Sequence, residues 1–166
     1  GRVLLAQRPE GKSMAGLWEF PGGKMAPGET PEAALIRELK EELGIDITAS
    51  CLAPLFFASH TYEDFHLLMT LHACRVWQGT PAPQEGQTLK WVRPYDMGGY
   101  DMPPADAPLV ALLQDLAVSS SLGVESIERN GHHYFSGLSA FPQTVGQQVL
   151  KLHGDLYRES EGGWPS

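Results

Sequence analysis

Acidic side chains with a metal-binding spacing stand out in residues 23–45, which read GKMAPGETPEAALIRELKEELGI. Glu38, Glu41 and Glu42 are spaced i, i+3 and i+4, so a helix would place their carboxylates on one side. Like charges at this spacing repel one another, and a divalent cation would reverse that effect. Carboxylate oxygens with room for phosphate oxygens and water suit Mg²⁺. A solvated acidic face is the alternative interpretation of these three residues.

The flanking residues predict the helix that carries these carboxylates. Thr30 can cap its first turn, Pro31 suits the first helical position, and Gly44 favours the left-handed conformation that ends helices. We therefore expect a helix over residues 31–43. Its apolar positions fall on the side opposite the carboxylates and should face the core: Leu35, Ile36, Leu39 and Leu43.

The full spacing of this stretch matches a known family signature. It reads Gly23-x5-Glu29-x7-Arg37-Glu38-Leu39-x-Glu41-Glu42-x-Gly44-Ile45. It resembles the Nudix box, and the chain resembles the MutT-like branch of the Nudix hydrolases. The resemblance begins upstream in VLLAQRP and GLWEFPGGK and ends near residue 109.

The resemblance implies a fold and a reaction. The expected fold class is α+β, a Nudix α/β/α sandwich with a mixed sheet. The implied reaction is hydrolysis of a nucleoside triphosphate to the monophosphate and pyrophosphate, with 8-oxo-dGTP as the favoured substrate. Mg²⁺ is the implied cofactor, with Mn²⁺ as a possible substitute. A net charge of −8 agrees with this requirement, because an acidic protein needs a cation to bind a polyphosphate.

The resemblance also implies roles for individual residues. Glu29 would pair with and orient Arg37. Glu85, in the sequence QEGQ, resembles a loop glutamate that lies near the metals as a ligand or base. The general base is left open among Glu41, Glu42 and Glu85. The implied metal ligands are the carbonyl of Gly23 and the carboxylates of Glu38, Glu41, Glu42 and Glu85.

Substrate contacts are expected from a few residues outside the helix. Arg8 resembles an arginine that contacts the phosphates or the base, and Lys24 is a further cation close to the motif. Asp106 occupies the place where relatives that act on oxidised guanine carry an asparagine. An ionised aspartate only accepts, so it could take bonds from guanine or from the amino group of cytosine. Alternatively, or in addition, Asp106 caps a helix at 107–117.

Two other functions fit the same motifs. A CTP- or dCTP-type pyrophosphohydrolase is the first, because pyrimidine triphosphate hydrolases look similar at Asp106. A catalytically silent nucleotide-binding Nudix domain is the second. Such domains usually lose box glutamates, and all four, Glu29, Glu38, Glu41 and Glu42, are present here.

Composition excludes several other classes of protein. The 166 residues are 42% hydrophobic, without a Lys/Arg run or an apolar stretch long enough for a transmembrane helix. Cys51 and Cys74 have neither zinc-site nor disulfide-framework spacing, which favours free thiols in a cytoplasmic protein. We expect a nucleotide as partner, neither nucleic acid nor membrane, and a monomer or homodimer. Phe56, Phe57, Tyr62, Phe65 and Trp91 are possible base-stacking residues, although most are expected in the core.

The pattern along the chain predicts a Nudix domain over 1–118 and a C-terminal extension over 119–166. Strands are expected near 2–7, 17–20, 46–58, 65–77 and 89–92, with an extended loop over 94–108. The chain begins within a strand pattern, and we expect a preceding first strand to be missing from it. Residues 145–157 have helical periodicity. The stretches GHHYFSGLSAFP and HGDLYRES weakly resemble a C-terminal segment of the enolase superfamily.

Overall fold

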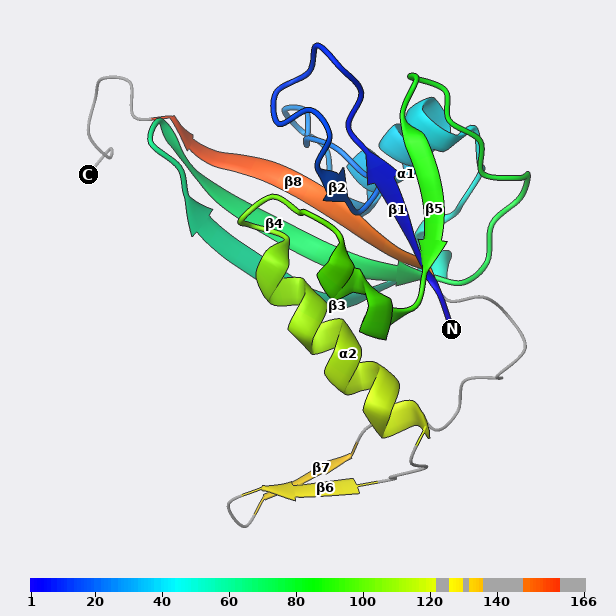
Figure 1. Cartoon of the computed structure of the whole chain (residues 1–166), viewed down its shortest axis with the longest axis vertical. Coiled ribbons are helices and arrows are strands. Elements are labelled where there is room, and N and C mark those ends of the chain that lie inside the picture. Colours follow the sequence, from blue (N-terminus) through cyan, green and yellow to red (C-terminus); the bar gives the residue numbers. More distant parts are fainter. Residues whose placement is uncertain (122–125, 130–131, 136–147, 159–166) are drawn as a thin grey trace.

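The strands form two three-stranded sheets and a small hairpin (Figure 1). The computed structural model describes residues 1–121, 126–129, 132–135 and 148–158. One sheet has the order β2-β1-β5, with bounds Trp18–Glu19, Val3–Gln7 and Thr88–Val92. The other has the order β3-β4-β8, with bounds Leu52–Thr61, Phe65–Cys74 and Gln148–Arg158. β6 (Ser126–Arg129) and β7 (His132–Phe135) form the hairpin.

Two main helices pack on the sheets. α1 spans Pro31–Leu43 and α2 spans Ala107–Ser121; short 3₁₀ helices, η1 and η2, cover Ala49–Cys51 and Pro94–Gly99. Neighbouring residues of β1 point to opposite sides, so Leu5 joins the core beneath α2 and Leu4 joins the core beneath α1. The described part of the chain has no helix long and apolar enough to cross a membrane.

The ends of α1 form as the sequence predicts. The side chain of Thr30 accepts from the Ala33 N–H at 3.2 Å, and Gly44, with φ +70°, donates its N–H to the Lys40 carbonyl. Leu35, Leu39 and Leu43 are fully buried. The predicted helix over 31–43 is therefore confirmed, and its apolar side fixes the direction in which the carboxylates face.

The α+β class is confirmed, but the pairing differs from the expected mixed sheet. Every described strand pair is antiparallel. β3 and β4 form a hairpin, while β5 and β8 run opposite to their partners β1 and β4. Such pairs form without the long crossover that a parallel pair needs.

Three elements also depart from the sequence predictions. α2 continues to Ser121 instead of ending at residue 117, and η2 occupies part of the expected loop. Residues 148–158 form strand β8, so the helix predicted from the periodicity of 145–157 is wrong. Leu150 and Leu152 also alternate with polar neighbours, and pairing along the edge of β4 favours this second period. The boundary and role of the extension over 119–166 stay predictions.

Candidate active site

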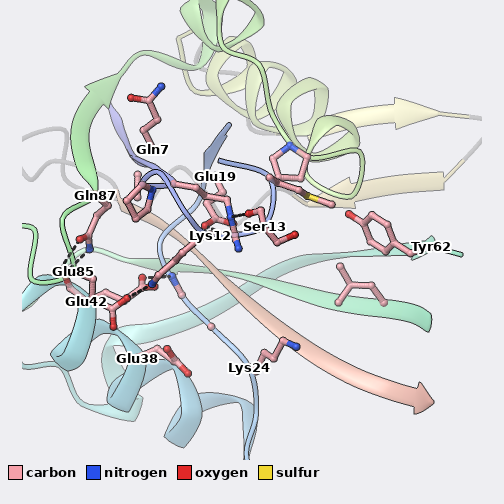
Figure 2. A pocket seen from close by; sticks show the side chains of 18 of the residues that line it. Gln7, Lys12, Ser13, Glu19, Lys24, Glu38, Glu42, Tyr62, Glu85 and Gln87 are labelled. Atoms are coloured by element: carbon pink, nitrogen blue, oxygen red, sulfur yellow. Dashed lines mark hydrogen bonds and ion pairs between the residues drawn. The ribbon is translucent and has the colours of Figure 1, made fainter. Parts of the chain in front are cut away.

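A cavity of about 540 Å³ lies among the loop after β1, α1, the start of β4 and the loop before β5. This volume is within the range of small-molecule sites. Figure 2 shows carboxylates of Glu42 and Glu85 at one end of the cavity and the ring of Tyr62 at the other. Its charged lining residues are Arg8, Lys12, Glu19, Lys24, Glu38, Glu42 and Glu85.

Arg37 organises the first half of the carboxylate row. It binds Glu29 through two bonds, Nε–H to Oε1 at 2.8 Å and Nη2–H to Oε2 at 2.9 Å. Nη1 donates to Glu38 at 2.7 Å and to Glu41 at 3.4 Å, and Nη2 also donates to the Lys24 carbonyl. The bonds from Arg37, and then one from the Ala26 N–H, lower the pKa of Glu29 to about 2. This part of the row is balanced by protein groups alone.

Glu42 lies in a different environment, one helical turn further along α1. Its Oε2 accepts from the Gly22 N–H at 3.2 Å. Burial raises the pKa of Glu42 to about 7, and repulsion from Glu19, Glu38 and Glu85 adds to the shift. A carboxylate in this position gains from any cation that enters the cavity.

Gln87 joins the loop that carries Glu85 to the end of α1. Its side-chain oxygen accepts from the Glu85 N–H at 2.8 Å, and its Nε2 donates to the Glu42 carbonyl at 2.8 Å. Gln87 is buried, so these bonds are shielded from water. They hold the Glu85 backbone beside Glu42, and the Glu85 carboxylate accepts from Lys12 at 2.5 Å.

Gly23 allows the chain to approach α1 closely. A Cβ built on Gly23 would lie 2.1 Å from both Cδ and Oε2 of Glu38. No side chain fits there unless Glu38 moves, so glycine is required for Glu38 to occupy its place. The expected role of the Gly23 carbonyl as a metal ligand stays a prediction.

Arg8 is fixed in the wall of the cavity. Its Nη1 donates to both oxygens of Glu19, at 2.9 and 3.0 Å, and its Nε donates to the Ser13 carbonyl at 2.6 Å. These bonds hold the loop after β1 over the cavity. Lys24 also lines the cavity, and the expected substrate contacts of Arg8 and Lys24 stay predictions.

Aromatic side chains line the end of the cavity away from Glu42. The rings of Tyr62 and Phe65 stack with centroids 4.8 Å apart, and both residues line the cavity. Phe56 and Phe57 are more than half exposed, so the core position expected for most of the aromatics is wrong for these two. Among the candidate stacking residues, the structure therefore selects Tyr62 and Phe65.

Asp106 lies behind this aromatic end. It is fully buried, directly before α2, and the negative charge of Asp106 is near enough to raise the pKa of Tyr62. Its own N–H donates to the Pro103 carbonyl, and its carbonyl accepts from the Leu109 N–H. Pro103 lines the cavity whereas Asp106 does not, so contact with a base would need a shift of this segment.

The predicted residues thus separate into two groups. Those that line the cavity are Arg8, Gly23, Lys24, Glu38, Glu42 and Glu85. Those outside its lining are Glu29, Arg37, Glu41 and Asp106. Within the described residues, no three His, Cys, Asp or Glu side chains form a ready metal site. Instead Glu38 faces Arg37, Glu85 faces Lys12, and Glu42 faces the Gly22 amide.

Three residues of the site were missed as site residues by the sequence analysis: Lys12, Glu19 and Gln87. Glu19 follows the hydrophobic pattern of a short strand, and Lys12 had been considered only as a surface cation. Gln87 follows Glu85 by two residues, and its place in the sequence QEGQ was the one available signal. Their roles depend on contacts between segments far apart in the chain.

The comparisons with known proteins agree with this geometry. A family model described as the NUDIX domain matches residues 1–112. The chain is 45% identical over 112 residues to the CTP pyrophosphohydrolase of Escherichia coli (strain K12), covering 66% of this chain and 80% of that protein. It is 35% identical over 114 residues to the 8-oxo-dGTP diphosphatase of the same organism, covering 69% and 87%.

Solved structures show the same similarity. The solution structure of the E. coli ORF135 protein matches with a TM-score of 0.63 and 36% sequence identity, covering 72% of this chain and 84% of that one. The family match ends before the C-terminal extension, and the weak enolase resemblance of that extension finds no support in these comparisons.

Proposed function

The chain belongs to the Nudix hydrolases, and on this premise we propose that it hydrolyses nucleoside triphosphates to monophosphate and pyrophosphate with Mg²⁺. The observation that carries this proposal is the two-ended cavity. Carboxylates of Glu38, Glu42 and Glu85 gather at one end, and the stacked rings of Tyr62 and Phe65 lie at the other. A metal-bound polyphosphate and a base fit these two ends.

The residues present fit a divalent cation. Glu42 is a partly buried carboxylate with its pKa raised to about 7, and only a cation would fully relieve its burial and the nearby negative charges. Glu38, Glu41, Glu42 and Glu85, with the Gly23 carbonyl, would hold the ion, and Mn²⁺ could replace Mg²⁺. When bound, it would neutralise phosphate charge and lower the pKa of water.

The protein groups account for positioning in the reaction. Water adds to the β-phosphorus, and the bond from that phosphorus to the oxygen shared with the α-phosphate breaks. Arg8 and Lys24 would bind phosphate oxygens, and Arg37 holds Glu38 in place through its bonds to Glu29. Glu41, Glu42 and Glu85 are the candidates for accepting the proton of the water. Two of them, Glu42 and Glu85, line the cavity.

Two bases are supported as substrates. The first candidate is 8-oxo-dGTP, as the sequence predicts and as several curated relatives suggest. The second is CTP or dCTP, favoured by the 45% identity to a CTP pyrophosphohydrolase and by the acceptor-only side chain of Asp106. The free thiols of Cys51 and Cys74 are consistent with activity in the cytoplasm.

Pyrophosphate release from 8-oxo-dGTP, dGTP, dCTP and CTP, with and without Mg²⁺, tests the proposal. We expect Mg²⁺-dependent turnover of at least one of the four. A higher kcat/KM for 8-oxo-dGTP than for dGTP would identify a nucleotide-sanitising enzyme. A preference for cytosine nucleotides would identify the second candidate, and no turnover of any of the four would refute the proposed function.

A further inference from the structure

An ion pair between two loops crosses the carboxylate end of the cavity. Lys12, in the loop after β1, donates to the Glu85 Oε2 at 2.5 Å, although the two residues are 73 positions apart. In Figure 2 the Lys12 side chain extends toward Glu85 and the Glu42 end of the site. Lys12 therefore occupies a carboxylate that the proposed function assigns to the cation.

The ion pair is built to break more easily than the other ion pair of the wall. Its side chains are 50% and 43% exposed, whereas those of Arg8 and Glu19 are 26% and 15% exposed. An exposed lysine–carboxylate pair contributes about 1 kcal/mol or less. Arg8 makes two bonds to its partner, and Lys12 makes one to Glu85.

The backbone around Lys12 is held while its side chain can turn. The Lys12 N–H donates to the Pro9 carbonyl, and the next residue, Ser13, accepts from Arg8 at 2.6 Å. The Lys12 ammonium sits on four flexible methylene groups and binds phosphate as a point charge. A change of partner would therefore need side-chain rotation without refolding of the loop.

The charge balance of the cavity gives Lys12 a reason to change partners. Four carboxylates and three cations line it: Glu19, Glu38, Glu42 and Glu85 against Arg8, Lys12 and Lys24. A cation bound by Glu85 repels the Lys12 ammonium at the same oxygen. An entering triphosphate brings several negative charges to the same end of the cavity.

We propose that Lys12 is a phosphate-binding residue that exchanges partners: it pairs with Glu85 until a divalent cation takes that carboxylate, and it then binds the phosphates of the triphosphate. This inference rests on the proposed function. It makes Lys12 a competitor of the metal and an ally of the substrate, so its removal should have opposite effects on the two affinities.

Binding of Mn²⁺ alone, and of inorganic triphosphate in the presence of Mg²⁺, measures these two effects. In Lys12→Ala we expect Mn²⁺ to bind about two- to fivefold more tightly, the factor that corresponds to a weak exposed pair. We expect inorganic triphosphate to bind about tenfold more weakly, since one charge-assisted bond is lost. In the nucleotide assay KM should rise by a similar factor with kcat nearly unchanged.

Lys40→Ala is the matched control. Lys40 pairs with Asp46 at 2.7 Å, with both side chains more than half exposed, and lies outside the cavity lining. It removes the same charge from the protein, so it accounts for the general effect of net charge on cation binding. We expect a smaller gain in Mn²⁺ affinity and no loss of triphosphate affinity.

Glu85→Gln identifies the carboxylate that is competed for. In this background Lys12→Ala should no longer tighten Mn²⁺ binding, because the shared partner is absent. Unchanged or weaker Mn²⁺ binding in Lys12→Ala, or no Mn²⁺ binding by the wild type, would overturn the exchange. So would unchanged triphosphate binding. If no nucleotide is hydrolysed while both binding shifts appear, the proposed function fails and the exchange stands.

Discussion

The two halves of the carboxylate row on α1 differ in how their charge is balanced. Around Arg37, the carboxylates of Glu29 and Glu38 have protein cations as partners, and Arg37 makes bonds of 2.7 to 2.9 Å to both. One turn further along, Glu42 has an amide partner and three carboxylates nearby. The same residue type thus serves two purposes within one short helix.

The pKa values show what this difference means. The pKa of Glu29 is lowered to about 2 by its bonds to Arg37, whereas that of Glu42 is raised to about 7 by burial. The Arg37 half is a finished structural network that aims Glu38. The Glu42 half is electrostatically incomplete, and the missing charge is the one that a divalent cation supplies.

Replacing Glu42 should produce the largest effect and should separate stability from activity. Glu42→Gln keeps an acceptor for the Gly22 N–H but loses the charge. We expect kcat to fall by about 10³, the factor for several kcal/mol of lost charge stabilisation. The free energy of unfolding without metal at pH 8 should rise, because a buried charge is removed. Steady-state kinetics and urea unfolding measure both.

Glu41→Gln is the comparison for that experiment. Glu41 is 55% exposed and lies outside the cavity lining, so its carboxylate carries little burial cost. We expect the rate to fall by powers of ten, as for a metal ligand, with unchanged stability in the absence of metal. Wild-type rates from a folded Glu42→Gln protein would contradict the role given to Glu42.

Arg37→Lys should break the finished half of the row. Lysine keeps the charge but cannot reproduce the forked bonds to Glu29 and the bond to Glu38. We expect the free energy of unfolding to fall by about 1–2 kcal/mol, after allowance for partial exposure, and kcat/KM to fall about tenfold as Glu38 loses its orientation. Chemical denaturation and nucleotide kinetics check these changes.

Arg93→Lys is a matched control for that substitution. Arg93 donates to Asp96 at 2.8 Å, but both side chains are exposed and outside the cavity. A change in unfolding free energy of less than about 0.5 kcal/mol is expected. Equal losses for the two variants would mean that the Arg37 network is an ordinary surface ion pair.

The smallest expected effect is a pH dependence of stability. The folded pKa of Glu42, about 7, lies above its ordinary value of 4.5, so the folded protein retains this proton longer than the unfolded chain. The contribution is fully present below pH 4.5 and is lost as the pH rises through 7. We expect the free energy of unfolding without metal to fall by on the order of 1 kcal/mol across this window.

The same measurement on Glu42→Gln isolates that contribution. His72, whose pKa is lowered by burial, titrates in both proteins, so the difference between them cancels it. Glu29 acts in another window: its pKa of about 2 means that its stabilisation is present above pH 4.5 and is lost only as the pH falls toward 2. Identical pH profiles for the two proteins would refute the raised pKa of Glu42.

Local features of the fold and site were predictable. Thr30, Pro31 and Gly44 specify both ends of α1 because capping depends on neighbouring residues. The pairing of Glu29 with Arg37 was also expected and is present in the structure. By contrast, the periodicity of residues 145–157 predicted a helix where β8 lies, since a short pattern fits two periods and the edge of β4 selects one.

The sequence by itself determined which residues form the carboxylate row, because spacing within one helix sets their directions. Only the tertiary structure decided which carboxylates face the cavity and what each one contacts. Gln87 reaches the carbonyl of Glu42 across 45 residues, and Lys12 reaches Glu85 across 73. Such partners depend on how separate loops pack, and no local pattern encodes that packing.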